Sequence, residues 1–191
     1  GGGVYVARYD IASFLVGRRI AVLGQRGVGK TVLLRFLTEG TAVSDYNPTR
    51  GAEQRGSGHH VAPPKTDNLY VKKTSDVSGD EMSTESWRAA FYAASQEKGL
   101  CFYLVNAKML QDGNALHIRR VQEDAEKIGE WIDGLPARRN PKLFIVATHV
   151  DHVAEWSNGS ISEKVSVEDR IRNHDAFDMF RLKRALFMKV L

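Results

Sequence analysis

The sequence contains very little cysteine and no long apolar run. Cys101 is the only cysteine among 191 residues, which excludes a disulfide framework and favours a reducing, cytoplasmic setting. Cys101 lies within an apolar segment, so we expect a buried, unreactive thiol. No apolar segment approaches the ~20 residues that cross a bilayer. Neither a signal peptide nor a prenylation box is visible, and we expect no integral membrane segment.

Charge of one sign is also lacking. There are 27 Lys and Arg residues against 23 Asp and Glu residues, a net charge of +4, so composition predicts no nucleic-acid partner. Apolar residues make up 42% and charged residues 26% of the chain, as in soluble globular proteins. The length predicts one domain with a full core.

A glycine-rich segment, GQRGVGKT, is the strongest chemical signal. It directly follows the apolar run 20–23, which predicts a strand, a phosphate-binding loop and the start of a helix. Backbone N–H groups of the loop converge on an anion, Lys30 reaches the β- and γ-phosphates, and the Thr31 hydroxyl ligates Mg²⁺. An ordinary glycine-rich turn with a solvent-facing lysine is the alternative. The predicted phosphate-binding residues are Gly24, Gln25, Arg26, Gly27, Val28, Gly29, Lys30 and Thr31.

Apolar strands alternate with helical patterns along the rest of the chain. This alternation predicts an α/β fold with a doubly wound, mostly parallel sheet, whose ligand lies at the carboxyl ends of the strands. We expect strands at 18–23, 69–74, 100–105 and 142–147, and helices at 4–16, 31–37, 84–95, 112–133 and 167–191. Residues 41–64 and 151–165 are predicted as loops, the first with at most a weak strand at 60–62 and the second ending at a capping box of Ser166 and Asp169.

Two short motifs follow predicted strands at the expected ligand edge. In DVSG, Asp76 can hold Mg²⁺ through water and the Gly79 N–H can contact a γ-phosphate, although such motifs also occur in plain turns. In THVD, the Asp151 carboxylate can accept both N1–H and N2–H of guanine, a donor pair that adenine lacks. A helix cap is the alternative role for Asp151.

A third motif lies in the predicted loop 41–64. There YNPT places Thr49 where it can ligate Mg²⁺ and close over the γ-phosphate. Thr41 is the competing candidate for this role, and a plain turn is the alternative because Asn-Pro starts turns.

In this order the motifs resemble those of the Ras-like small GTPases, most closely the Arf-like branch, over residues 18–151. NPTRG is similar to switch I. DVSGDEMSTESWRAAFY is similar to switch II with its tryptophan–arginine pair, and THVD stands where the family has NKxD or TKxD. The resemblance implies GTP and GDP binding with Mg²⁺, slow hydrolysis, and loops at 41–64 and 76–95 that contact an effector or regulator. It divides the chain into an extension, 1–17, and a GTPase-like domain, 18–191. The domain could belong to a larger protein or complex.

Two departures from the family concern hydrolysis. Asp80 occupies the place of the glutamine that orients the attacking water, and a carboxylate cannot donate an amide hydrogen bond, so we expect weak hydrolysis. Arg26 occupies a loop position that is often small in this family. We consider it as an arginine supplied in cis to the γ-phosphate, with Arg50 and Arg55 as rivals.

Two further departures concern the base and the end of the fold. His149 replaces the lysine whose stem lies along the base, and Thr148 precedes it. After Asp151 we find neither the last strand nor the serine–alanine box nor the last helix of the family, so the predicted fold lacks them. Three alternatives stay open: a hydrolysis-deficient switch or scaffold, a P-loop ATPase, and a kinase.

Overall fold

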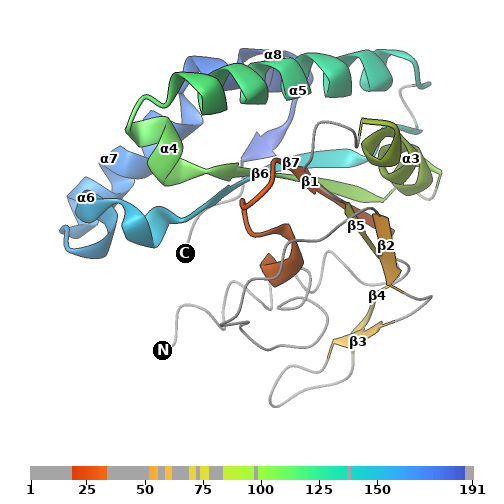
Figure 1. The fold of residues 1–191 in the computed structure, drawn as a ribbon, viewed down its shortest axis with the longest axis horizontal. Helices are drawn as coiled ribbons and strands as arrows, with labels where there is room; N and C mark the ends of the chain where they lie inside the picture. The colour runs from red at the N-terminus through yellow and green to blue at the C-terminus, as the bar shows by residue number, and fades with distance from the viewer. Residues whose placement is uncertain are drawn as a thin grey trace.

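A six-stranded sheet forms the centre of the computed structural model, which describes residues 19–33, 52–55, 59–61, 69–71, 74–77, 84–96, 99–136 and 139–187. Its strand order is β2-β5-β1-β6-β7-β8 (Figure 1). Every neighbouring pair is parallel except β2 with β5. The strands are β2 (Ala52–Arg55), β5 (Thr74–Val77), β1 (Ile20–Gly24), β6 (Leu100–Asn106), β7 (Lys142–Thr148) and β8 (Leu186–Phe187).

The two central strands are buried along their whole length. All residues of β1 and β6 are buried, as expected for parallel strands covered on both faces. One face packs into a large cluster that includes Leu23, Phe91 and Tyr103. The other face packs into a smaller cluster that includes Val22 and Phe102, with Leu33 against it. Helical residues 30–33 and the long helix α5 lie on opposite faces of the sheet (Figure 1). The α/β, doubly wound, mostly parallel fold is therefore confirmed.

Helices cover the large cluster, and the sequence located them well. Helix α3 (Thr84–Ser95) has the predicted bounds. Helix α5 (Ala115–Asp133) begins three residues later than predicted, because Asn114 accepts a hydrogen bond from the His117 N–H and caps it. On α5, Val121, Ala125 and Ile128 are buried as expected, whereas Ile118 and Ile132 are only partly buried. The short helix α4 (Ala107–Gln111) was not predicted.

The segment after β7 differs most from the prediction. Residues 151–165 are not a loop: they contain η3 (Val150–His152), α6 (Ala154–Ser157) and the start of α7 (Ile161–Arg172). The capping box consists of Ser160 and Glu163; the predicted box of Ser166 and Asp169 is wrong, since both residues lie within α7. The same spacing occurs twice, but only the first pair ends in Glu, the residue that a capping box favours at this position, whereas the second ends in Asp.

The predicted helix 167–191 is also interrupted. After α7 the chain forms η4 (Asp175–Phe177), α8 (Asp178–Leu182) and then β8, which pairs parallel with β7. The breaks allow Phe177 and Phe180 to be fully buried in the large cluster. The expected lack of a last strand therefore needs correction: a strand is present here, although it is only two residues long.

The predicted loop 41–64 contains β2, which the sequence missed, and a strand at 59–61 that overlaps the weak strand expected at 60–62. β2 lies within 41–64 and pairs antiparallel with β5, and β3 (His59–Val61) pairs antiparallel with β4 (Leu69–Val71). The predicted strand 69–74 is thus divided between β4 and β5. The predicted helix 4–16 lies outside the described residues, as does most of the predicted helix 31–37 beyond residue 33. Among the described helices, none has the length and apolar character needed to cross a membrane.

Candidate functional site

Four strand ends meet at one edge of the sheet. The register pairs Val22 of β1 with Asp76 of β5, and Gly24 of β1 with Leu104 of β6. It also pairs Asn106 at the end of β6 with Thr148 at the end of β7. Because these strands are parallel, the residues that follow them gather at a single edge, where ligands of such sheets bind.

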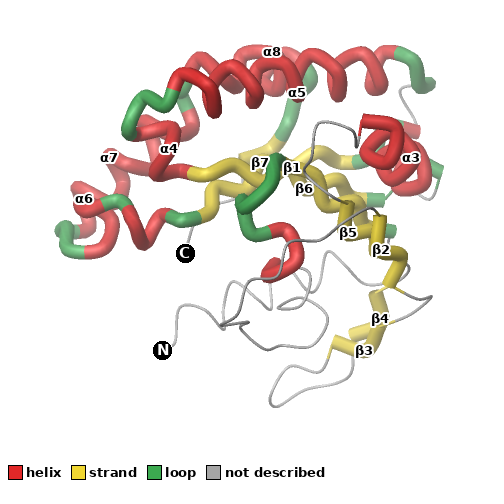
Figure 2. The backbone as a smooth tube through the Cα atoms, in the orientation of Figure 1, coloured by secondary structure: helices red, strands yellow, loops and turns green. Residues whose placement is uncertain are grey.

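The glycine-rich loop leaves β1 at this edge and leads into a helical turn, shown as a green segment before a short red one in Figure 2. Gly24, Gly27 and Gly29 have positive φ values of 140°, 80° and 89°, which side chains rarely tolerate. A Cβ on Gly24 would also lie 2.6 Å from the Leu104 carbonyl oxygen. The loop therefore depends on glycine both for its turns and for its close approach to β6.

Lys30 is folded back over the loop that precedes it. Its side chain is buried, with 7% of the residue exposed. Nζ donates hydrogen bonds to the carbonyl oxygens of Gly24 and Gln25, each at 2.8 Å. These bonds hold the positive charge in the centre of the loop, where an anion would meet both the ammonium and the loop N–H groups.

The predicted Mg²⁺ ligands are only partly within the described residues. Thr31 is half-buried in the first helical turn after the loop, and Asp76 is the third residue of β5, opposite Val22. Thr49, Gly79 and Asp80 lie outside the described residues, as do the alternatives Thr41 and Arg50. Among the described residues, no three His, Cys, Asp or Glu side chains cluster as a metal site would require.

The THVD segment follows β7 and turns at once. His149 has φ 56°, an uncommon left-handed conformation that is often found at functional sites. The Thr148 hydroxyl donates to the Val105 carbonyl at 3.0 Å and lies 3.0 Å from His149 Nδ1. Burial, followed by His152, lowers the pKa of His149, and Asp151 opposes that shift.

Asp151 presents its carboxylate to solvent. Its side chain is 77% exposed, and Oδ2 lies 3.5 Å from His152 Nε2. The Ser157 hydroxyl donates to the backbone oxygen of Asp151 and holds the short turn in place. The carboxylate is thus accessible to hydrogen-bond donors of a ligand at this edge.

A cavity of about 210 Å³ adjoins the glycine-rich loop on the side of α4 and α5. Sequence patterns did not predict it, because its walls come from distant segments. Two arginines, Arg26 and Arg120, are among its lining residues, and Asp and Glu are not. The full lining is Gln25, Arg26, Gly27, Val28, Asn106, Met109, Asn114, Leu116, His117 and Arg120.

At the wall of this cavity, a partly buried polar cluster connects the loop with α5. Gln25 Oε1 lies 3.0 Å from His117 Nδ1, and the Tyr103 hydroxyl donates to Asp124 Oδ2 at 2.8 Å. Burial raises the pKa of both Tyr103 and Asp124 and lowers that of His117. The signal missed in the sequence was His117 at a position of the helical repeat that faces the core.

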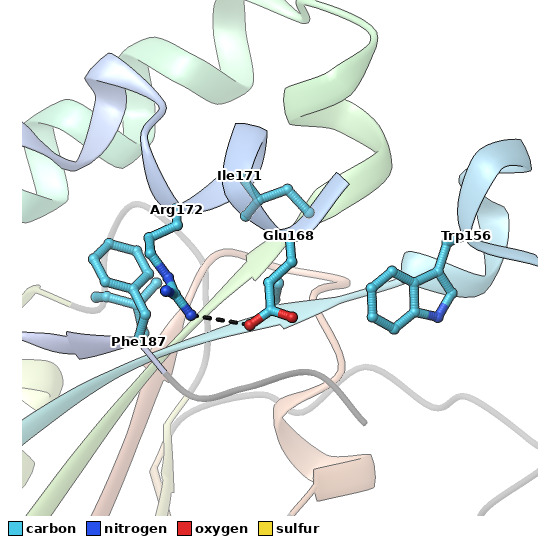
Figure 3. A pocket seen from close by; sticks show the side chains of 7 residues that line it. Trp156, Glu168, Ile171, Arg172 and Phe187 are labelled. Atoms are coloured by element: carbon cyan, nitrogen blue, oxygen red, sulfur yellow. Dashed lines mark hydrogen bonds and ion pairs between the residues drawn. The ribbon is translucent and has the colours of Figure 1, made fainter. Parts of the chain in front are cut away.

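A second, much smaller cavity of about 20 Å³ lies away from the loop, between β7, β8 and α7. Figure 3 shows Trp156 on one side and Phe187 on the other, with Glu168 and Arg172 joined by a 2.9 Å ion pair. Its size and mostly apolar walls do not suit a nucleotide.

Burial raises the pKa of the Cys101 thiol well above its usual range, which agrees with the unreactive thiol expected from the sequence.

Comparison with known proteins gives a distant likeness of fold. No family model and no curated protein matches the chain. Solved structures do match, among them a chain of the structure of the mammalian SRP receptor, with 20% identity and a TM-score of 0.47. The match covers 68% of this chain and 61% of that one, so the chain spans about three fifths of the length of that solved chain. A likeness of this size does not extend to function.

Proposed function

We propose that this chain is a GTP-binding molecular switch that binds GTP with Mg²⁺ and hydrolyses it slowly to GDP. The observation that carries the proposal is the meeting of the GQRGVGKT loop, Asp76 and the THVD segment at one edge of the sheet, through the registers of β1, β5, β6 and β7. A glycine-rich turn with a solvent-facing lysine does not account for a buried Lys30 bonded to two loop carbonyls.

In the proposed complex the loop and Lys30 hold the phosphates. The N–H groups of the loop and the start of the helix supply a positive field, and Lys30 exchanges its carbonyl partners for phosphate oxygens. Thr31 and Thr49 would ligate Mg²⁺, with Asp76 bonded to it through water and Gly79 donating to the γ-phosphate. Mg²⁺ would neutralise phosphate charge during transfer to water.

Base selection is assigned to the segment 148–151. The exposed Asp151 carboxylate would accept two N–H groups of guanine, the half-buried His149 ring would lie along the base, and Thr148 would fix the turn through its bond to Val105. Adenine has no matching donor pair, so Asp151 makes the site selective for guanine nucleotides.

Hydrolysis is expected to be weak, with Asp80 in the place of the water-orienting glutamine. Arg26 is exposed on the loop, and it is our candidate for contacting the γ-phosphate in cis. In single-turnover reactions, unchanged rates in Arg26→Ala would remove Arg26 from the mechanism. A hydrolysis-deficient switch that binds an effector or regulator through residues 41–64 and 76–95 is the second candidate, and Asp80 favours it.

The nucleotide that copurifies with the protein tests the proposal directly by mass spectrometry. GTP supports binding without hydrolysis, GDP supports a working GTPase, and ADP or ATP overturns the assignment in favour of an ATPase. Competition between GTP and ATP for the emptied protein, repeated with Asp151→Asn, tests base selection. Equal affinities in the unmutated protein would refute the role of Asp151.

A further inference from the structure

The side chain of Gln25 connects the phosphate loop to a helix that is distant in the sequence. Its Oε1 lies 3.0 Å from His117 Nδ1, across 92 positions of the chain. With the amide in this orientation, Oε1 can only accept, so Nδ1 carries the proton and donates. His117 lies in the first turn of α5, whose cap is Asn114, so the partner of Gln25 is fixed to a long, regular element.

This contact is partly buried, and its other polar neighbours are the Asn106 carbonyl beside His117 and the side chains of Tyr103 and Asp124 beside Gln25. His117 is 4% exposed. Among the described residues, His117 Nε2 and Gln25 Nε2 are buried without a hydrogen bond of good geometry. The charged groups around the pair are Arg120 and Asp124 on α5, and Arg26 on the loop. Breaking the Gln25–His117 bond would remove the partner that the structure gives to Gln25 Oε1 and His117 Nδ1, at the cost of a partly buried hydrogen bond.

Gln25 is bound at both ends. Its carbonyl oxygen accepts from Lys30 Nζ at 2.8 Å, while its side chain is bound to His117. The next residues include Gly27 and Gly29, and glycine does little to restrict the backbone to one conformation. Without the side-chain bond, Gln25 would lose its hydrogen bond to α5. Its backbone carbonyl, which accepts from Lys30 Nζ, would then be held in place less firmly.

We propose that His117 and Gln25 act as a positioning pair, in which α5 fixes the phosphate loop in the conformation that receives the nucleotide phosphates. The inference rests on the proposed nucleotide binding, and it adds that the Gln25–His117 bond increases the affinity for the nucleotide. In this proposal neither side chain touches the nucleotide: the pair acts through the backbone of residues 25–27 and, before the nucleotide binds, through the bond between the Gln25 carbonyl and Lys30 Nζ.

The experiment uses two nearly isosteric substitutions of His117 in the whole chain. His117→Asn places an amide N–H where Nδ1–H stands and keeps the donor, whereas His117→Leu removes it. Binding of a fluorescent GTP analogue should weaken roughly tenfold in His117→Leu, the equivalent of about 1.4 kcal/mol, and stay within about twofold of the unmutated protein in His117→Asn. Equal losses in both variants would overturn the proposal, because they would reflect packing and not the bond.

A double-mutant cycle measures whether the two residues act together. Gln25→Leu alone should weaken binding as much as His117→Leu, and the double variant should be little worse than either one. Additive losses would refute the pair. His174→Leu is the control: His174 caps η4 through the Ala176 N–H, away from the loop, so this variant should lose stability without losing affinity.

Hydrogen exchange in nucleotide-free protein separates failure of this inference from failure of the proposed function. The loop amides of Gly27 and Gly29 should exchange faster in His117→Leu than in His117→Asn. If the unmutated protein binds no nucleotide, the proposed function and the link to affinity both fail, and the exchange rates still decide whether α5 fixes the loop. If it binds but His117→Leu binds equally well, only the positioning pair is overturned.

Discussion

At the scale of single residues, Lys30 holds a buried positive charge inside the loop. We expect Lys30→Met to weaken binding of GTP with Mg²⁺ by roughly a hundredfold, since two hydrogen bonds to a charged group are lost at about 1.5 kcal/mol each. Titration calorimetry measures this change. Lys108→Met is the matched control, because Lys108 pairs with Asp112 on the surface of α4. An equal loss in both variants would show that the effect is not specific to the loop.

The raised pKa of Asp124 predicts how the free energy of unfolding changes with pH. Burial raises its pKa above the ordinary 3.8, against opposing contributions from Tyr103 and Lys127. Just above pH 3.8 the folded chain keeps a proton that the unfolded chain has lost, so this contribution to stability falls as the pH rises through the folded pKa. The side chain in Asp124→Asn does not titrate, so this variant should not show the loss. In urea unfolding it should therefore gain stability relative to the unmutated protein as the pH rises. Parallel curves would contradict the prediction.

His117 affects the free energy of unfolding in the opposite direction and at higher pH. Burial lowers its pKa below 6.5, with Arg120 adding to the shift and the Asn106 carbonyl opposing it. As the pH falls below 6.5 the unfolded chain takes up a proton that the folded chain resists, so stability is lost toward the folded pKa. His117→Asn should not show this loss. The difference in unfolding free energy between the two proteins, followed from pH 7 downward, checks it.

At the scale of elements, α7 allows a comparison between a serine that caps the helix and a serine inside it. Ser160 forms both halves of a capping box with Glu163, whereas Ser166 is exposed within the helix. Ser160→Ala should destabilise the protein by about 1 kcal/mol. Ser166→Ala should be neutral or slightly stabilising, because alanine favours helix interiors. Chemical denaturation of the two variants measures the difference, and a larger loss in Ser166→Ala would contradict the observed cap.

The elements also show where sequence patterns suffice. Helix 84–95 and the strands 100–106 and 142–148 were predicted to within one residue, because their apolar patterns coincide with the faces that are buried. The polar strand 52–55 was missed, since its place in the sheet depends on pairing with β5 and not on a pattern of its own. The breaks between α7 and β8 depend on the burial of Phe177 and Phe180, which no local signal specifies.

For the whole molecule, ligand binding should appear as added stability. At a free GTP–Mg²⁺ concentration of 100 times Kd, mass action adds about 2.7 kcal/mol, which corresponds to a rise in Tm of roughly 5–10 °C for a chain of this size. ATP–Mg²⁺ at the same concentration should give little or no rise. In Asp151→Asn the response to GTP should fall toward the response to ATP. A thermal scan measures all three, and equal rises for GTP and ATP in the unmutated protein would contradict guanine selection.

The sequence by itself predicted a phosphate-binding loop and the order of the strands and motifs, because glycine, lysine and threonine at this spacing are typical of such loops and buried parallel strands have a distinctive composition. The meeting of Asp76 and Thr148 at one edge with the loop was inferred from that order, and the strand registers now establish it. Only the tertiary structure decided that Gln25 turns toward His117, that Lys30 folds over the loop, and that residues 160–187 form three short helical segments and a strand. These features depend on contacts between residues far apart in the chain, and no local pattern records such contacts.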